Sequence, residues 1–176
     1  MKKKMQYAVL LLCVVSILNE SCKKEISDPL SQQDILLSGV SENAAIPPFN
    51  LEVILRGEGQ MFGHIKFRQD NDIDKIITLS TWVRDLEPNH EYLLQRAVDA
   101  INVVDGNCTS TTWLTLGKGL TPQSIITDGN GTGTASLFRN VSAIPSGSAF
   151  DIHFQVIDAV SSAIVLTSDC YKYVVR

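Results

Sequence analysis

Three histidines, His64, His90 and His153, are the side chains of this sequence best suited to acid–base or metal chemistry. Each stands alone in the sequence, on the polar face of an expected strand or in a turn. His153, together with Asp151 and a loop serine, could build a hydrolase site, because the members of a catalytic triad need not be close in sequence. The sequence has no Gly-x-Ser-x-Gly elbow. We expect solvent-facing histidines and no catalytic residues, with a small hydrolase as the alternative.

Two loops rich in oxygen-bearing side chains, residues 70–74 and 128–133, have the composition of calcium sites, which need six to eight oxygen ligands. Lys75 stands where an EF-hand loop needs its glycine, and Arg139 takes the final ligand position of the second loop. Turns explain both loops without an ion, because Asp, Asn and Gly accept positive φ and bond their own backbone. We expect no metal and no cofactor.

The N-terminus has the pattern of an export signal. Lys2, Lys3 and Lys4 precede an uncharged apolar run of 12 residues, from Tyr7 to Leu18. A helix needs about 20 apolar residues to span a bilayer, which disfavours a permanent transmembrane anchor. Residues 1–21 are therefore predicted to be a cleaved signal peptide.

Ser21 and Cys22, directly after this run, resemble a bacterial lipobox. The resemblance implies cleavage before Cys22, lipidation of its sulfur, including palmitate, and attachment to the membrane through this lipid anchor. Asn19 and Glu20 depart from the commonest lipobox, which has an aliphatic and then a small residue at these places. An ordinary secretory signal is the alternative. Lys23-Lys24-Glu25 is similar to part of a signal that sends lipoproteins to the surface of some Gram-negative bacteria, which implies the outer membrane, on its periplasmic or cell-surface face.

The cysteines fit this division of the chain. Cys13 leaves with the signal peptide and Cys22 takes the lipid, so Cys108 and Cys170 are left as one pair. An even number of cysteines in an exported chain predicts a disulfide, worth about 4 kcal/mol for such a long loop. A metal site would need further ligands, and neither cysteine has a nearby His or second Cys. Two free thiols or a metal pair are the alternatives.

Charge and composition exclude some functions. Residues 1–21 contain three lysines and Glu20, so 12 of the 15 basic and 18 of the 19 acidic residues stay in the mature chain, with a net charge of −6. Such a balance excludes nucleic acid as the expected partner. With 44% hydrophobic residues the chain can fold.

Residues 22–48 carry polar residues and two adjacent prolines with little periodicity, which indicates a flexible linker. Residues 49–176 have the size of one domain. There the dominant period is two: apolar and polar residues strictly alternate in 150–156, as in a strand with one buried face. The other expected strands are 49–55, 63–68, 76–84, 113–116, 124–127, 134–138 and 164–175.

Residues 93–101 fit helical spacing as well, but the residues before them favour a strand. Leu86, Pro88 and Tyr92 resemble the tyrosine corner of fibronectin type III and other immunoglobulin-like sandwiches, which would make Tyr92 open a strand. More strands follow Tyr92 than a fibronectin module has. The prediction is therefore an all-β chain with a single immunoglobulin-like β-sandwich of about seven to nine strands. The stretch from 103 to 173 also looks like exported bacterial proteins of no established activity.

Trp82 and Trp113 are more typical of a core than of a sugar-stacking surface. The function that the sequence favours is a non-catalytic, lipid-anchored cell-envelope protein that binds a protein or carbohydrate ligand through loops at one end of the sandwich. A small extracytoplasmic hydrolase is the alternative.

Overall fold

Strands make up the regular structure of residues 47–176, the part of the chain that the computed structural model describes, and no helix lies in this part. The all-β prediction is confirmed. The first strand begins at Phe49, where the domain was expected to start. The predicted signal peptide, Cys22 and all but the last two residues of the predicted linker lie outside the described residues.

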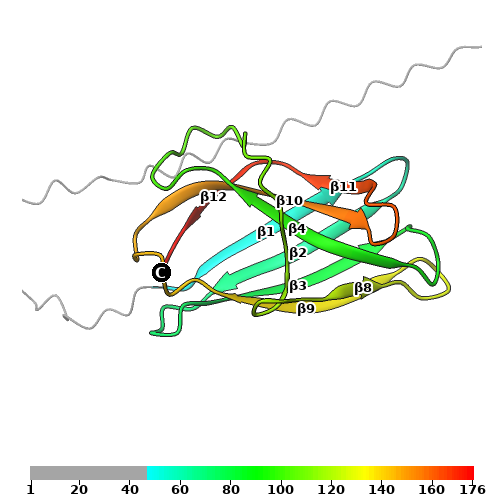
Figure 1. Cartoon of the computed structure of the whole chain (residues 1–176), viewed down its shortest axis with the longest axis horizontal. Coiled ribbons are helices and arrows are strands. Elements are labelled where there is room, and N and C mark those ends of the chain that lie inside the picture. The colour runs from blue at the N-terminus through cyan, green and yellow to red at the C-terminus, as the bar shows by residue number, and fades with distance from the viewer. Residues whose placement is uncertain (1–46) are drawn as a thin grey trace, which may run out of the picture. The chain divides into compact units, whose positions relative to one another are not determined.

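Twelve strands follow one another within residues 47–176, and Figure 1 labels the longer ones. The predicted strands are all present, two short ones, β6 and β7, are additional, and residues 93–98, for which a helix was the alternative, belong to β4. The bounds are β1 Phe49–Arg56, β2 Phe62–Gln69, β3 Ile76–Arg84, β4 Glu91–Val98, β5 Leu114–Thr115, β6 Gly117–Lys118, β7 Thr121–Pro122, β8 Ser124–Ile126, β9 Gly133–Asn140, β10 Ala149–Asp158, β11 Ile164–Ser168 and β12 Tyr171–Val174.

All twelve strands hydrogen-bond into one sheet that curls nearly closed into a barrel (Figure 1). The path through the sheet is β5-β4-β10-β11-β1-β2-β3-β9-β6-β7. β8 pairs with β4 on one side, and a bridge between Thr127 and Gly133 joins its end to the start of β9. The predicted immunoglobulin-like sandwich of seven to nine strands is not confirmed, because the twisting strands keep one continuous set of hydrogen bonds instead of two stacked sheets.

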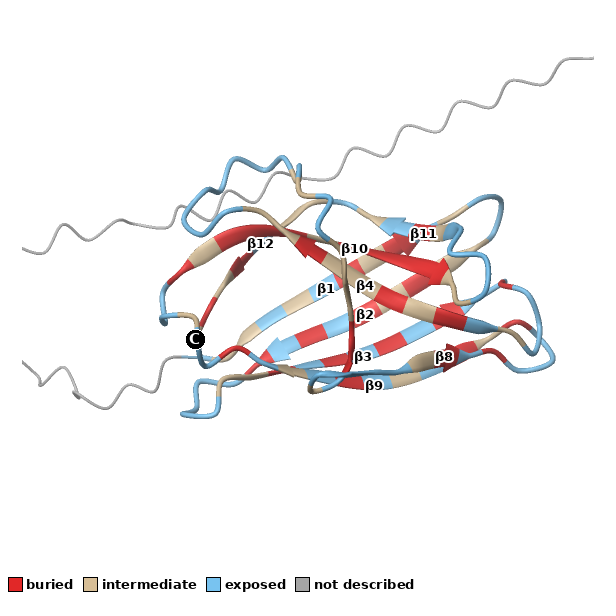
Figure 2. Ribbon diagram, in the orientation of Figure 1, coloured by how far each residue is buried: buried red, intermediate tan, exposed pale blue. Residues whose placement is uncertain are grey.

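One side of each long strand fills the interior, and the colours of Figure 2 alternate accordingly along β2 and β3, whereas β10 is buried on both faces. In β3, Ile77, Leu79 and Val83 are buried. Trp82 has the opposite phase, so it lies on the outer face, 36% exposed and edge-on to the ring of Phe62. The core prediction for Trp82 is wrong for this reason.

The predicted strand 164–175 is divided into β11 and β12 at Asp169 and Cys170. Both parts pair antiparallel with β10, β11 with its second half and β12 with its first. Cys170, at the interruption, is joined to Cys108 with the two Cα atoms 5.4 Å apart. The disulfide agrees with the predicted pair, and it ties the loop between β4 and β5 to the β11–β12 edge.

The predicted tyrosine corner is present at the start of β4. The backbone N–H of Glu87 donates to the hydroxyl of Tyr92 (3.0 Å), and Tyr92 is buried as the second residue of the strand. The corner is also held by Gly131, whose carbonyl accepts from the Leu86 N–H (3.2 Å). Gly131 has φ +74°, and a Cβ there would collide with the Leu86 carbonyl, so only glycine fits this contact.

Candidate functional site

The interior of the nearly closed barrel contains a cavity of about 140 Å³. Side chains from β2, β3, β4, β9, β10 and β12 line it, and most of them are apolar. Phe67, Phe150, Phe154 and Tyr173 contribute aromatic rings to this lining. The core is thus incompletely filled on the side of the barrel where β4 and β9 end.

The cavity reaches the surface beside the loops that follow β4 and β9. Ile101, from the first loop, is part of the lining and is 52% exposed. Ile144, from the second loop, is half-buried and also lines the cavity. The Lys75 ammonium donates to the Ile144 carbonyl (3.0 Å) and so fastens the second loop to the turn before β3.

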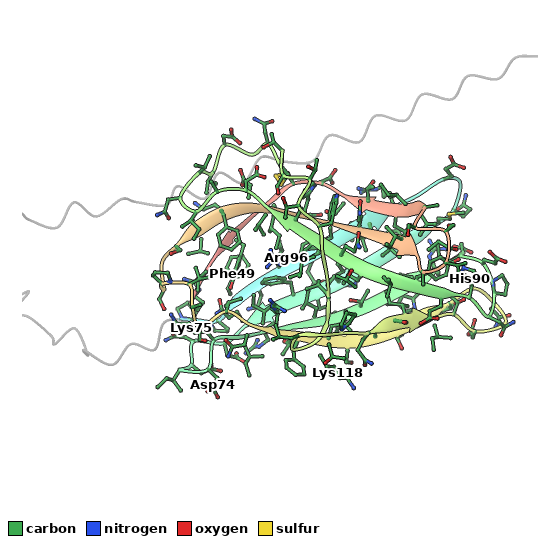
Figure 3. The ribbon with its side chains drawn as sticks, in the orientation of Figure 1. Phe49, Asp74, Lys75, His90, Arg96 and Lys118 are labelled. Atoms are coloured by element: carbon green, nitrogen blue, oxygen red, sulfur yellow. A yellow bond between two sulfur atoms is a disulfide. The ribbon has the colours of Figure 1, made fainter. Side chains whose placement is uncertain are left out.

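Arg96 is a charged side chain on the inner face of the sheet. Residues two apart on a strand share a face, so Arg96 has the phase of Leu94 and Val98, and its partner across the ladder is Phe154 of the core. Arg96 points from β4 into the space that the sheet encloses (Figure 3). An arginine therefore replaces the apolar residue that the alternation calls for.

Arg139 is a second inward-facing arginine, on β9. It shares the phase of the buried Leu137, it is paired across the ladder with Ile77, and both Arg139 and Ile77 line the cavity. Its guanidinium donates to the Gly119 carbonyl (3.2 Å). The cavity thus carries two guanidinium groups on an otherwise mostly apolar wall.

Neither arginine forms an ion pair with a carboxylate among residues 47–176. Burial lowers the pKa of Arg96, and the nearby positive charge of Arg139 lowers it further. Asp99 is the carboxylate of the lining, but its oxygens accept from the backbone N–H groups of Thr109 and Ser110, at 2.7–3.2 Å. The Thr109 bond is the main cause of the lowered pKa of Asp99.

Tyr173 has its hydroxyl occupied within the core. It donates to the side-chain carbonyl of Gln69 (2.6 Å), and burial raises the Tyr173 pKa above its ordinary value. The same Gln69 oxygen accepts from the Arg176 backbone N–H (2.9 Å). Tyr173 therefore offers the cavity its ring, and the two arginines are the groups suited to receive an anion.

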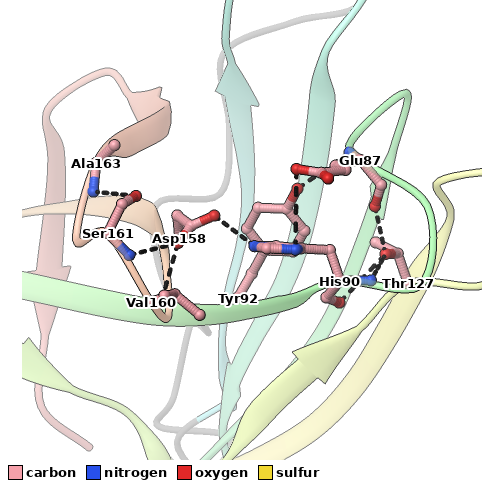
Figure 4. Close-up of polar contacts among 8 residues, drawn as sticks. All are labelled: Glu87, His90, Tyr92, Thr127, Asp158, Val160, Ser161 and Ala163. Atoms are coloured by element: carbon pink, nitrogen blue, oxygen red, sulfur yellow. Dashed lines mark hydrogen bonds and ion pairs between the residues drawn. The ribbon is translucent and has the colours of Figure 1, made fainter.

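A second polar cluster lies at the other end of β4, around His90 (Figure 4). The Nε2 atom of His90 lies 2.5 Å from Asp158, and Nδ1 lies 3.8 Å from Glu87. The Asp158 carboxylate also accepts from the backbone N–H groups of Ser161 (2.7 Å) and Val160 (2.8 Å). The Ser161 amide is the main cause that lowers the Asp158 pKa to about 2.

Thr127 completes this cluster. Its hydroxyl accepts from the His90 backbone N–H (2.9 Å) and donates to the Glu87 carbonyl (2.6 Å). Because both ring nitrogens of His90 face carboxylates, neither faces a serine or threonine hydroxyl that it could activate. These four residues, Glu87, His90, Thr127 and Asp158, are called the clasp below, because their contacts join the β3–β4, β8–β9 and β10–β11 turns.

The residues of the predicted hydrolase alternative, His153 and Asp151, are covered by the loop between β4 and β5. Asp151 is 1% exposed and accepts from the backbone N–H groups of Asp105 and Gly106 (2.9 and 2.8 Å). His153 is half-buried, with Nε2 3.0 Å from the Ser110 carbonyl and its ring stacked on Trp113. These groups hold the loop in place, and no hydrogen bond within the described residues joins His153 to Asp151.

The expectation of solvent-facing histidines is thus wrong for His153, and it needs correction for His90 and His64, whose side chains are 23% and 27% exposed. His64 lies on the outer face of β2 but is half-buried against the Glu52 carboxylate of β1. Trp113 is also half-buried, on the outer face of the sheet, so it is neither an interior residue nor an open stacking platform.

The two oxygen-rich loops form turns. Asp128 accepts from the backbone N–H groups of Asn130 (2.8 Å) and Thr132 (3.0 Å), and Asp72 accepts from that of Lys75 (2.8 Å). Over residues 47–176, no group of three or more His, Cys, Asp or Glu side chains is placed to hold a metal ion.

The sequence interpretation missed both arginines of the cavity, although a signal for them exists. The tyrosine corner fixes Tyr92 as an inward-facing residue, and Arg96 is four residues later in the same strand, hence in the same phase. Apolar Leu93 and Ala97 hide this phase, because Ala97 is buried on the outer face under the loop between β4 and β5.

No known family model matches the sequence, and no curated protein matches it either. Within residues 47–176, no helix has the length and apolar character needed to cross a membrane.

Proposed function

We propose that residues 47–176 form a binding module for a small, largely apolar molecule, and that a lipid on Cys22 holds this module at the bacterial cell envelope. The observation that carries the proposal is the cavity of about 140 Å³ inside the barrel, with aromatic and aliphatic walls and an exposed rim at Ile101. The module is non-catalytic in this proposal, with the binding site in the interior instead of on a protein- or carbohydrate-binding surface.

The size and lining of the cavity support a small ligand. Natural cores are packed to crystal-like density, so a void of this size leaves its walls without contacts that a ligand would restore. An engineered cavity of about 150 Å³ lined by Leu, Ile and Phe stays dry and binds benzene. The ligand expected here is accordingly no larger than one ring or a short chain.

The cellular location in this proposal rests on the N-terminal sequence pattern and on the disulfide. Three lysines, an apolar run of 12 residues and Ser21-Cys22 fit an exported lipoprotein, and the Cys108–Cys170 bond fits an oxidising compartment. We also propose that the domain is related in fold to the immunoglobulin-like sandwiches, which the tyrosine corner at Tyr92 supports.

The cavity is tested with toluene as the probe and Val98→Trp as the blocking variant. Val98 lines the cavity, so the indole should fill it and abolish the toluene-induced shifts of interior methyl signals in NMR spectra of the purified full-length protein. Val160→Trp is the matched control, because Val160 lies in an outer turn and is 83% exposed. Toluene shifts that persist in Val98→Trp, or that never appear in the wild type, would contradict the proposal.

The lipid anchor is tested by metabolic labelling with a palmitate analogue. We expect label in the wild type and none in Cys22→Ala, since the thioether carrying the lipid cannot form without the cysteine sulfur. Equal labelling of both chains would end the lipoprotein proposal.

A further inference from the structure

We infer that the cavity ligand is a small amphipathic carboxylate, whose apolar body fills the cavity and whose carboxylate is bound by Arg96 and Arg139. This inference rests on the proposed function and adds the chemical class of the ligand. The cavity lining combines two kinds of residue. Most are apolar, but two are arginines that have no anionic partner in the described residues.

The phase of the strands makes these arginines part of the interior. Arg96 lies opposite Phe154, and Arg139 lies opposite Ile77, in ladders whose inward positions are otherwise mostly apolar. A solvent-exposed arginine needs no partner, but a guanidinium in this environment loses hydration, and two of them repel each other. The lowered pKa of Arg96, caused first by burial and then by Arg139, reflects the same two costs.

An anion between the two groups would offset both costs. A carboxylate matches the planar fork of a guanidinium and accepts two parallel N–H bonds from it. Asp99 does not fill this role, since its oxygens already accept from Thr109 and Ser110 backbone N–H groups and it forms no ion pair with either arginine.

The rest of the lining decides between an organic anion and an inorganic one. Phosphate or sulfate would satisfy the arginines but leave the walls formed by Phe67, Phe150 and Leu116 without contacts. A ligand with a ring or a short chain beside its carboxylate makes both sets of contacts. Tyr173 adds an aromatic wall without competing for the anion, because its hydroxyl is bonded to Gln69.

The test compares phenylacetate with phenylacetamide, which has nearly the same shape and no charge, on the purified full-length protein at constant ionic strength. We expect the wild type to bind the anion about tenfold more tightly or better, as charge-assisted hydrogen bonds to a partly buried guanidinium imply. Dissociation constants come from ligand-detected NMR titrations, which suit weak binding.

Arg96→Met is the decisive variant, because methionine keeps an unbranched apolar stem and removes the charge. The preference for phenylacetate should disappear in Arg96→Met, survive in part in Arg96→Lys, and stay unchanged in the control Arg56→Met, whose arginine has a side chain 66% exposed. Arg139→Met should weaken the preference as well, although it also removes the bond to the Gly119 carbonyl.

The outcomes separate this inference from the proposed function. If phenylacetate and phenylacetamide bind equally well and both are blocked by Val98→Trp, the cavity binds ligands but the carboxylate assignment is overturned. If inorganic phosphate competes as strongly as phenylacetate does, the arginines form a general anion site and the assignment also fails. If neither compound binds although toluene does, the carboxylate assignment fails and the proposed function stands, whereas if toluene does not bind either, the proposed function fails first.

Discussion

The charged groups near the two ends of β4 differ in whether they have partners of opposite charge. At the end that begins with Glu91, His90 lies between Asp158 and Glu87, and Thr127 bonds two neighbouring backbone groups. Toward the other end, Arg96 faces a cavity and meets another arginine instead of a carboxylate (Figures 3 and 4).

This difference indicates that the His90 end has a structural role and that the Arg96 end is a candidate binding site. A polar cluster whose members are paired with one another stabilises the turns that it joins and has little capacity left for a ligand. Unpaired charges beside an incompletely filled cavity cost stability, and they can recover that cost only by binding something. Changes at the His90 end should therefore alter stability, and changes at the Arg96 end should alter binding.

The largest expected effect on stability is at the paired end. Thr127→Val keeps the shape of the side chain but leaves the His90 N–H and the Glu87 carbonyl without their partner. We expect the free energy of unfolding to fall by about 2–3 kcal/mol, because two partly buried backbone groups lose their hydrogen bonds. Urea denaturation followed by circular dichroism measures the change.

Thr81→Val is the matched control for this substitution. Thr81 is buried on the inner face of β3, and its hydroxyl has no hydrogen-bond partner among residues 47–176. The same change there should be neutral or slightly stabilising, since it removes a polar atom that gains nothing from burial. Equal losses at both positions would mean that the added valine methyl, and not the loss of the Thr127 hydrogen bonds, causes the change in stability.

A smaller effect of opposite sign is expected at the unpaired end. Arg96→Met should raise the free energy of unfolding of the ligand-free protein by about 1 kcal/mol, because an apolar side chain replaces a charge that lacks a counter-ion among residues 47–176. The same denaturation experiment measures it. A clear loss of stability would show that Arg96 has a structural partner, and it would contradict the proposed difference between the two ends of β4.

The smallest expected effect is on the stability of the protein at low pH. The pKa of Asp158 is lowered from 3.8 to about 2 in the folded protein, so its ionised form is the one that folding favours. Its contribution to stability is present above the unfolded-state pKa and is lost as the pH falls toward 2. The melting temperature of Asp158→Asn should therefore fall less than that of the wild type between pH 5 and pH 2.5.

Other carboxylates, among them Asp99 and Asp128, also have lowered pKa values, so both proteins should lose stability in acid. The difference between the two slopes isolates Asp158. Parallel slopes would mean that the clasp does not depend on the charge of Asp158.

Alternation in the sequence was sufficient to predict most of the strands, although β4 needed the tyrosine corner and the short β6 and β7 were missed. In β2, for example, the spacing of Gly63, Ile65 and Phe67 leaves one choice of buried side. The tyrosine corner and the cysteine pair were also predictable, because each depends on a local motif or on an even count. The closure into a single curled sheet depends on distant pairings such as β8 with β4, which no local pattern contains.

The cavity could not be predicted, and the inward phase of Arg96 was hidden, for a related reason. β4 and β10 are covered on both faces, by the interior on one side and by the loop between β4 and β5 on the other. The expectation that polar residues of a strand face solvent therefore fails there. Asp151 and His153 looked like solvent-facing groups although they anchor this loop. The sequence pattern did not single out Arg96, although it faces inward.

The dissociation constant of phenylacetate, measured for the wild type, Arg96→Met and Thr127→Val under conditions in which all three are folded, tests the central claim most directly. We predict that Arg96→Met weakens binding by about tenfold or more, while the less stable Thr127→Val binds within about twofold of the wild type. Wild-type affinity in Arg96→Met, or an equal loss in Thr127→Val, would contradict it.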